Sequence, residues 1–457
     1  MPRYSVAASS YNNMAQQRKI QDYDPVYSFL RYYVDFVLKL SYRTIRYVGR
    51  ENVPTDGAII YAPNHTNALM DALVILAMDR KAKVFVARAD IFKNPTFAKI
   101  LSFLKIMPIM RMRDGIDEVR KNNETIERAV DVLRDGVPFC IFPEGTHQTK
   151  YSSLPLSKGI FRIAFQAEEL IDDMPLYIVP VGLRYGNFFR FRSTVRIAVG
   201  EPIDVGAFRK EHSTMAEAEQ MALLRTILDE RMKQTIFYIP NDEEYDAKYE
   251  ICAAVVKQQV RHIDRDASGR RRRGLEAHFA ANNATLQELN RFKQEAPDVA
   301  KRLITLGNEA SAMRQKEHIS LSSVSIKYPL LSRLLMTLFM VVTLPYNLVA
   351  AVLTLPINAL AEWLFTKLKD PAFRNSVRYL LNLVLWPILI VVYSVVAYIV
   401  LPWQWALPIT IALLPAPIIV HEAWRLVRLM RSDIHLLLNG ELRKKYREIR
   451  HIIDKNR

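Results

Sequence analysis

The sequence is poor in residues that build covalent or metal-based frameworks. It contains only two cysteines among 457 residues, Cys140 and Cys252. A disulfide framework and a cysteine-based metal site are therefore not indicated. Cys140 lies in an apolar run, where a buried thiol is the expected state. The nine histidines show no pair at the spacing that places two metal ligands on one helix face. No metal site is predicted.

Two further features are missing. Residues 1–22 are polar and irregular, and they have no apolar core of the kind that a cleavable signal peptide needs. No serine or cysteine sits in a convincing nucleophile elbow. The sequence therefore gives no indication of catalysis through a covalent intermediate on such a residue.

Acidic residues are too few to balance the basic ones, and the formal net charge is +16. The arginine run at residues 270–273 is compatible with nucleic acid or with a solvated loop in a helical linker. No helix-turn-helix, zinc-finger or RNA-recognition signature accompanies it, so no nucleic acid partner is expected. An anionic membrane surface stabilises a bound protein by about 1 kcal/mol for each nearby Lys or Arg. The apolar segments described below favour this second partner.

Residues 49–240 alternate short apolar runs with amphipathic segments, which is typical of an α/β domain. Strands are predicted near residues 57–62, 83–87, 137–142, 176–181 and 194–199. Helices are predicted near residues 67–79, 117–134, 157–169 and 214–237.

The segment before this domain, residues 23–48, is predicted to be one helix rich in Tyr, Phe, Leu and Val. Its charges recur every four residues and form one stripe, at Arg31, Asp35, Lys39 and Arg43. An amphipathic helix of this kind suits a membrane interface. Packing against its own domain is the alternative, and the pattern does not decide between them.

Beyond the α/β domain the composition changes twice. Residues 241–325 are polar and charged, which predicts a helical arm. Residues 326–430 are predicted to form transmembrane helical hairpins, and residues 431–457 a basic C-terminal tail. The run at 379–401 is essentially uncharged and long enough to cross a hydrocarbon core, which needs about 20 helical residues. Residues 402–405 form a short link with two tryptophans, and a second apolar run follows at 406–420.

The earlier apolar stretch, residues 330–365, is interrupted by Pro345 and Pro356. It is too long for one comfortable span, so it predicts two short passes or a re-entrant hairpin. Lys and Arg residues flank the later hairpin on both sides, and cytoplasmic loops are rich in these residues. Two hairpins would keep the α/β domain and both flanks on the cytoplasmic side.

The most informative residues are His65 and Asp71. An apolar run at residues 57–62 ends at Pro63, and Asn64 or Thr66 is placed to cap the helix that follows. A histidine at such a turn, with a carboxylate in the next helix, suits a general base and the group that orients it.

Three more motifs follow in order along the chain. The first is Pro108-Ile109-Met110-Arg111-Met112-Arg113, the second is Phe142-Pro143-Glu144-Gly145-Thr146, and the third is the apolar run 176–181 with its Val179-Pro180 pair. With the His65–Asp71 motif, they resemble the four motifs of the glycerolipid acyltransferase family. This family contains the glycerol-3-phosphate and 1-acylglycerol-3-phosphate acyltransferases, including the PlsC-like enzymes. The resemblance covers residues 49–202.

The resemblance implies an α/β acyltransferase domain with a mixed sheet flanked by helices. It also implies transfer of a fatty acyl group from a thioester donor, an acyl-CoA or an acyl carrier protein, without a cofactor and without an acyl-enzyme intermediate. His65 would be the base and Asp71 its orienter. The substrate-binding residues would be Arg111, Arg113, Glu144, Gly145, Thr146 and Lys158.

The roles within that set differ. Arg111 and Arg113 would bind the acceptor phosphate and would share one face if extended, the alternative being solvent-facing charge. Glu144 would bind an acceptor hydroxyl, and Gly145 permits close backbone approach. Lys158 would add phosphate-binding charge, or is an ordinary first-turn lysine.

The chain departs from the family pattern at two places. Five residues separate His65 from Asp71, where four are common, so their contact becomes a question of geometry. His147 follows Glu-Gly-Thr where many relatives have Arg, which removes a fixed charge and a bidentate phosphate ligand.

These features together predict an integral membrane acyltransferase of phospholipid synthesis with its catalytic domain on the cytoplasmic face of a bacterial inner membrane or the endoplasmic reticulum. The acceptor would be glycerol-3-phosphate, dihydroxyacetone phosphate or a lysophospholipid, with the first two slightly favoured. The alternatives are a phospholipid transacylase or remodelling enzyme, and a degenerate membrane scaffold whose arm binds a partner.

Overall fold

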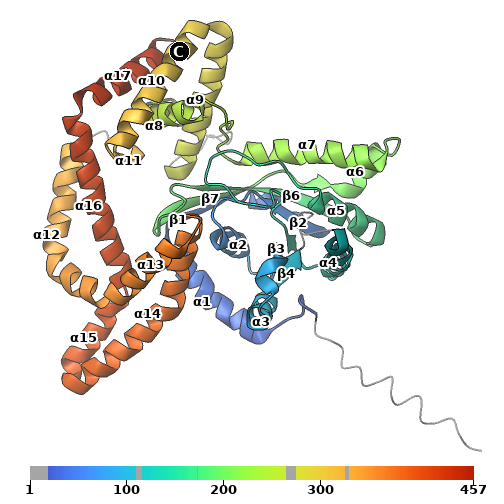
Figure 1. The fold of residues 1–457 in the computed structure, drawn as a ribbon, viewed down its shortest axis with the longest axis horizontal. Coiled ribbons are helices and arrows are strands. Elements are labelled where there is room, and N and C mark those ends of the chain that lie inside the picture. The colour runs from blue at the N-terminus through green and yellow to red at the C-terminus, as the bar shows by residue number, and fades with distance from the viewer. Residues whose placement is uncertain (1–18, 110–115, 172, 264–273, 325–328, 457) are drawn as a thin grey trace, which may run out of the picture.

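The computed structural model describes residues 19–456, apart from 110–115, 172, 264–273 and 325–328. Three parts are visible in Figure 1: an α/β domain, a helical arm, and an apolar helical region that contacts both. The arginine run at 270–273, Arg111, Arg113 and most of the predicted irregular segment 1–22 lie outside the described residues.

The α/β domain is built on one sheet of eight strands. Its strands are β1 Tyr42–Val48, β2 Ala58–Pro63, β3 Val84–Arg88, β4 Ile106–Ile109, β5 Phe139–Cys140, β6 Leu176–Tyr185, β7 Ser193–Val199 and β8 Ile203–Asp204. Their order is β1-β7-β6-β2-β5-β3-β4, with β8 paired to β6. All pairs are parallel except those of β6 with β7 and β8. The predicted mixed sheet flanked by helices is confirmed.

Helices cover both faces of this sheet. They are α1 Pro25–Ser41, α2 Leu69–Leu76, α3 Pro95–Phe103, α4 Ile116–Arg134, α5 Gly159–Leu170, α6 Val205–Glu211 and α7 Glu217–Thr235, with short 3-10 helices at Arg50–Asn52 and Ala89–Phe92. Residues of α4, α5, α6 and α7 form one core with the sheet, and residues of α1 and α2 form the other.

Strand β2 shows how the sequence fixes this layering. All six of its residues are buried. Ile60 belongs to the core on one face, whereas Ile59 and Tyr61 belong to the core on the other. Successive side chains of a strand point to opposite faces, so a strand buried on both sides is a continuous apolar run.

The helix predicted over residues 23–48 is wrong in its last seven residues. Helix α1 ends at Ser41, and residues 42–48 form strand β1, which pairs in parallel with β7 at the edge of the sheet. Thr44, Ile45 and Val48 are β-branched and favour a strand. Arg43 therefore does not belong to the helix, although it continues the four-residue spacing of the charges.

The first two charges of the stripe face the protein, whereas Lys39 is exposed. Arg31 and Asp35 are 5% and 7% exposed. The Arg31 guanidinium donates to the carbonyl oxygens of Arg80 and Lys81 at 3.2 and 2.9 Å, just beyond α2. The opposite face of α1 is apolar and exposed, at Val26, Phe29, Leu30, Tyr32 and Phe36.

The arm consists of α8 Tyr245–His262, α9 Gly274–Glu295, α10 Pro297–Lys316, α11 Leu321–Val324 and α17 Gly440–Lys455. It has its own apolar core. Segment 431–457, predicted as a basic tail, is instead helical: it contains the end of α16 and all of α17. Leu442, Tyr446 and Ile449 of α17 are buried in the core of the arm.

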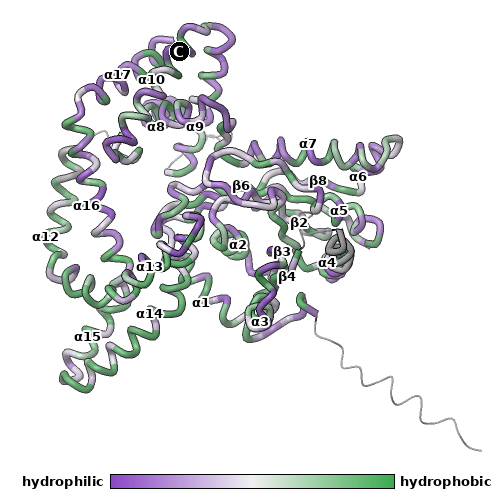
Figure 2. The backbone as a smooth tube through the Cα atoms, viewed as in Figure 1, coloured by the Kyte–Doolittle hydropathy of each residue, from purple (hydrophilic) through white to green (hydrophobic). Residues whose placement is uncertain are grey.

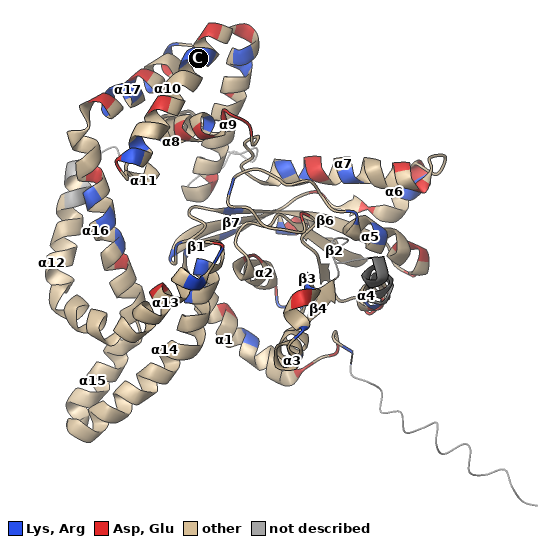
Figure 3. Cartoon of the chain, viewed as in Figure 1, with Lys and Arg blue, Asp and Glu red and all other residues tan. Residues whose placement is uncertain are grey.

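The apolar helical region consists of α12 Pro329–Leu353, α13 Leu355–Lys367, α14 Phe373–Val400, α15 Trp403–Leu413 and α16 Ala416–Leu438. Figure 2 shows that α12, α14 and α15 carry mostly hydrophobic residues, and Figure 3 that these helices hold almost no charge. Among the described residues two helices are long and apolar enough to cross a membrane, at Leu334–Leu353 and Phe373–Val400. The number rises to three if α15 and α16, bent by 55°, form one span.

The break in the first apolar stretch differs from the expectation. Pro345 lies inside α12, so this stretch does not divide there into two short passes. The helix ends near Thr354, and Pro356 lies in the first turn of α13, where its missing N–H costs no hydrogen bond.

Candidate active site

The sheet brings the predicted motifs to one edge. Strand β2 leads to His65, and its parallel neighbour β5 leads to residues 142–146. The carboxyl ends of parallel strands meet at the same edge, where α/β proteins bind ligands. Strand β6 runs parallel to β2 on its other side and ends at Tyr185.

His65 and Asp71 are in direct contact. The His65 Nδ1 atom lies 2.8 Å from Asp71 Oδ2. The backbone N–H groups of Thr66 and Asn67 donate to the same oxygen, each at 2.7 Å, and the Tyr185 hydroxyl donates to Oδ1 at 2.7 Å. Asp71 is fully buried. A buried carboxylate needs such donors, and these fix its position.

The turn between the two residues absorbs the additional residue. Helix α2 begins only at Leu69, which puts Asp71 in its first turn. Ala68, just before the helix, has φ 46° and ψ −125°, a backbone conformation that favours glycine. The loop thus folds back over the Asp71 carboxylate, so the longer spacing is compatible with the His65–Asp71 hydrogen bond.

The His65 ring is held from two sides. It stacks on Phe142 with ring centroids 4.3 Å apart, and it meets His147 edge-on at 5.3 Å. Its side chain is 19% exposed. In the part of the chain that the structure describes, Nε2 has no hydrogen-bond partner. In the tautomer whose Nδ1–H donates to Asp71, Nε2 carries the lone pair, which is the arrangement that a general base needs.

Glu144 occupies a structural position beside this pair. Its two carboxylate oxygens accept the backbone N–H groups of His65, at 3.0 Å, and Leu154, at 3.2 Å. Burial raises the pKa of Glu144 to about 7, although these two N–H groups and the nearby His65 act in the opposite direction. Glu144 therefore ties the loop after β5 to the loop after β2.

The other predicted binding residues lie around the same edge. Gly145 has φ 64°, and Thr146 is exposed. Lys158 is the exposed residue immediately before α5 rather than a first-turn residue. The backbone N–H of Ser157 donates to Pro143 at 2.7 Å, which places the start of α5 beside the loop.

His147, which replaces the arginine of many relatives, has a partner from the apolar helical region. Its Nε2 lies 2.7 Å from Asp370 Oδ2, in the link between α13 and α14, and its ring meets Phe373 at 5.3 Å. The sequence analysis did not single out Tyr185, Phe142 as a stacking partner, or Asp370. Tyr185 and Asp370 carry no local signal, because the fold alone brings them to His65 and His147.

No group of three or more His, Cys, Asp or Glu side chains that could hold a metal ion occurs among the described residues. The ionisable groups at this edge are a histidine, the carboxylate bound to it, and a buried acid with a raised pKa. Such a combination is typical of acid–base chemistry.

Comparisons with known proteins show what this part of the chain is similar to. The family model described as Acyltransferase matches residues 44–184. The chloroplastic 1-acyl-sn-glycerol-3-phosphate acyltransferase of Arabidopsis thaliana is 26% identical over 164 residues, which cover 34% of this chain and 42% of that protein. Glycerol-3-phosphate O-acyltransferase 2 of Saccharomyces cerevisiae is 31% identical over 134 residues, covering 29% and 18%.

The crystal structure of the 1-acyl-sn-glycerophosphate acyltransferase PlsC from Thermotoga maritima aligns with a TM-score of 0.34 and 19% identity, covering 50% of this chain and 87% of that one. The sequence matches span less than half the length of the plant relatives, 42% and 44%. Residues 44–184 are thus an acyltransferase domain. Its relatives place this domain in the glycerolipid acyltransferase family.

Proposed function

We propose that this protein is a membrane-bound O-acyltransferase that moves a fatty acyl group from a thioester to a hydroxyl of glycerol-3-phosphate or a lysophospholipid. The observation that carries the proposal is the contact between His65 Nδ1 and the buried carboxylate of Asp71, at the sheet edge that also presents residues 142–146.

The proposed reaction needs no protein nucleophile, because the thioester is already activated. His65 Nε2 takes the proton of the acceptor hydroxyl as its oxygen attacks the thioester carbonyl carbon. The C–S bond then breaks, and the departing thiolate takes the proton from the imidazolium. Asp71, held by Thr66, Asn67 and Tyr185, keeps the imidazole in the required tautomer and stabilises its cation.

The acceptor phosphate is proposed to bind near the start of α5. Lys158 and the start of α5, which has no side-chain cap, favour an anion there, and Gly145 and Thr146 border the same edge. Arg111 and Arg113 follow β4, a parallel strand whose carboxyl end lies at this edge. They are proposed as further phosphate ligands.

The membrane is the proposed source of lipid substrate. Helix α1 presents an exposed apolar face, and α3 adds exposed Phe97 and Ile100. The Tyr33 hydroxyl donates to the Leu383 carbonyl of α14 at 2.6 Å, so α1 is attached to a helix that could cross a membrane. Apolar surface of this extent, beside basic flanks, suits docking of the catalytic domain on the cytoplasmic face.

The test is acyl transfer by the full chain in phosphatidylcholine nanodiscs, with labelled acyl-CoA or acyl carrier protein as donor and glycerol-3-phosphate or lysophosphatidic acid as acceptor. A positioned general base contributes about 10²–10⁴-fold. His65→Ala is therefore expected to lose at least about 10²-fold in kcat. His451→Ala, at an exposed position on α17, is the matched control and should retain activity.

Equal activity of His65→Ala and the wild type would remove His65 from the mechanism. Transfer to a lysophospholipid without any added thioester would identify a transacylase. No transfer by the wild type with either donor would favour the scaffold alternative. The supporting observation for that alternative is that His147, which replaces the arginine of many relatives, is hydrogen-bonded to Asp370.

A further inference from the structure

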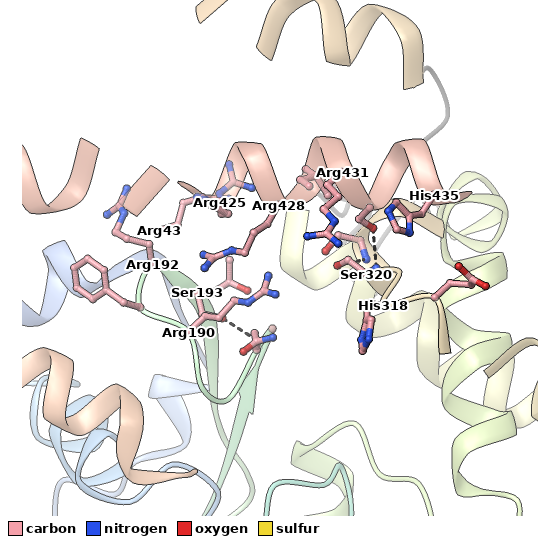
Figure 4. Close-up of a pocket in the computed structure, with 18 residues that line it drawn as sticks. Arg43, Arg190, Arg192, Ser193, His318, Ser320, Arg425, Arg428, Arg431 and His435 are labelled. Carbon is pink, nitrogen blue, oxygen red and sulfur yellow. Dashed lines mark hydrogen bonds between the residues drawn. The ribbon is translucent and has the colours of Figure 1, made fainter. Parts of the chain in front are cut away.

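A cavity lies at the junction of the three parts of the molecule. It has a volume of about 450 Å³. Its lining comes from the β6–β7 connection, from the segment joining α10 to α11, and from α16, together with Arg43 of β1. Figure 4 shows the arginines of α16 on one side of the cavity and Arg190 and Arg192 on the other.

This cavity shares no lining residue with the sheet edge that carries His65 and residues 142–146. None of His65, Asp71 and residues 142–146 lines it. Every lining residue lies outside residues 44–184, the segment that matches the acyltransferase family. Whatever binds here is therefore recognised by parts of this chain that the family match does not include.

The lining is strongly basic. It contains two histidines, His318 and His435, and six arginines: Arg43, Arg190, Arg192, Arg425, Arg428 and Arg431. Three of these arginines share the single carboxylate of Glu422. The Arg43, Arg192 and Arg425 guanidinium groups lie 2.6, 3.3 and 2.8 Å from it.

The other three arginines have no such partner. In the described part of the chain no hydrogen bond or ion pair is formed by Arg190, Arg428 or Arg431. Burial, with the neighbouring charges of Arg428 and Arg425, lowers the pKa of Arg190. Glu317 is the one acidic residue of the lining. Like charges brought together destabilise a fold, so this excess of arginine favours a bound anion.

Neutral hydrogen-bonding groups line the same cavity. Ser432 accepts the backbone N–H of Ser320 at 2.7 Å, and Ser193 accepts that of Asn187 at 2.8 Å. These bonds fix the two walls that carry the arginines. Arg425, Arg428 and Arg431 recur every three residues on α16, so they lie along neighbouring positions of one helix face.

The position along the chain fits a phosphate at a membrane boundary. The first of the three arginines of α16 lies five residues after the end of the apolar run 406–420. Guanidinium groups bind phosphate oxygens through paired N–H donors. We propose that this cavity is a phosphate-binding site, distinct from the acceptor site, that takes the phosphate group of an anionic phospholipid or of a soluble phosphate ester such as the nucleotide part of coenzyme A.

The test compares the full-length wild type in phosphatidylcholine nanodiscs with the double variant Arg190→Gln/Arg428→Gln. The matched control is Arg443→Gln/Arg447→Gln, which removes the same charge from exposed positions of α17. The soluble probes are inorganic phosphate and adenosine 3′,5′-bisphosphate, measured by titration calorimetry. The lipid probe is phosphatidic acid, measured by native mass spectrometry of protein from nanodiscs with equal parts of phosphatidic acid and phosphatidylcholine.

The wild type and the control variant are expected to bind at least one probe, and the cavity variant to bind it at least tenfold more weakly. Retention of phosphatidic acid assigns the site to a lipid headgroup, and binding of the bisphosphate assigns it to a soluble ester. The cavity variant is also expected to melt at the same or a higher temperature than the wild type without a probe, because repulsion is relieved.

Two results would overturn the proposal. One is equal binding of every probe by the wild type and the cavity variant, and the other is no binding of any probe by the wild type. If the cavity variant binds every probe as the wild type does but melts at a lower temperature, the proposal is also overturned. The arginines would then have a purely structural role.

Discussion

Asp71 shows how much of the site depends on single atoms. The sequence indicates both members of the His65–Asp71 pair, because a strand, a proline and a helix start surround them. It does not indicate that two backbone N–H groups and the Tyr185 hydroxyl hold the carboxylate. Those donors depend on the register of β6 beside β2 and on the shape of the loop. A sequence motif gives neither the strand register nor the loop conformation.

The loop conformation at Ala68 leads to a prediction about which residues it tolerates. A non-glycine residue with φ 46° and ψ −125° carries strain of about 1–3 kcal/mol, and a β-branched side chain carries more. Ala68→Gly should therefore stay within about 1 kcal/mol of wild-type stability, since relief of strain opposes the gain in unfolded-state entropy. Ala68→Val should lose more than about 2 kcal/mol and most of the activity.

Melting temperatures and kcat/KM of the two Ala68 variants check this prediction together. The glycine variant is the control for the position, because it changes the residue without adding bulk. Similar stability and activity of Ala68→Val and Ala68→Gly would mean that the loop is not constrained as described.

Glu144 predicts a pH dependence of stability. Its pKa is raised from 4.5 to about 7 in the folded state. Between these values the folded state binds more protons than the unfolded state, so stability falls as pH rises from 4.5 to about 7. At about 1.4 kcal/mol per pKa unit, this group contributes at most about 3 kcal/mol of that change. Glu144→Gln cannot titrate and should show a flatter profile.

The measurement is the melting temperature of both proteins across that pH range. Glu144→Gln should be less stable at low pH, since the amide offers one acceptor oxygen to two backbone N–H groups, so the slopes are compared rather than the absolute values. Parallel profiles would show that Glu144 does not titrate in this range.

At the scale of elements, the central strands and long helices could be predicted, and the edges could not. Strands β2 and β6 are continuous apolar runs that lie within about four residues of their predicted bounds, and α4 lies within one. Strand β1 is an edge strand with alternating exposed residues, so it resembles the amphipathic helix before it. The short β4 and β8 are defined by their pairing rather than by their composition.

The link between α13 and α14 is an element whose role follows only from the fold. Asp370 reaches His147, whose ring touches that of His65. Asp370→Asn should lower kcat/KM about three- to tenfold, because a hydrogen bond to a charged group contributes about 1.5–3 kcal/mol and part of this remains with the amide. Asp173→Asn, an exposed residue before β6, is the matched control.

A double-mutant cycle separates this coupling from a general effect on folding. If the two side chains act as a pair, His147→Gln combined with Asp370→Asn should be no worse than the more damaging single variant. Fully additive losses would show that the two residues act independently.

At the scale of the whole molecule, contacts between distant segments restrict how the chain can cross a membrane. Three later segments touch the α/β domain: the arm through Glu276 and Arg196 at 2.9 Å, the α13–α14 link through Asp370, and α16 through Glu422. All three must lie on the same side as that domain. The number of crossings is therefore even both before Asp370 and between Asp370 and Glu422.

This rule removes the option of one crossing by α12. Helices α12 and α13 together would cross twice or not at all. Beyond Leu383, which still contacts Tyr33, α14 continues for residues 384–400. At about 1.5 Å per residue this part is roughly 25 Å long, close to the hydrocarbon thickness of about 30 Å. It would end beside Trp403 and Trp405 at the far interface.

Single introduced cysteines can test this topology without background, since Cys140 and Cys252 are both buried. A membrane-impermeant maleimide should label Lys367→Cys, on α13, and Lys444→Cys, on α17, from the same side. Gln404→Cys, at the start of α15, should be labelled from the opposite side or from neither. Labelling of Lys367→Cys and Lys444→Cys from opposite sides would be incompatible with the contact between Asp370 and His147. The catalytic edge would then have to be complete without the apolar helical region.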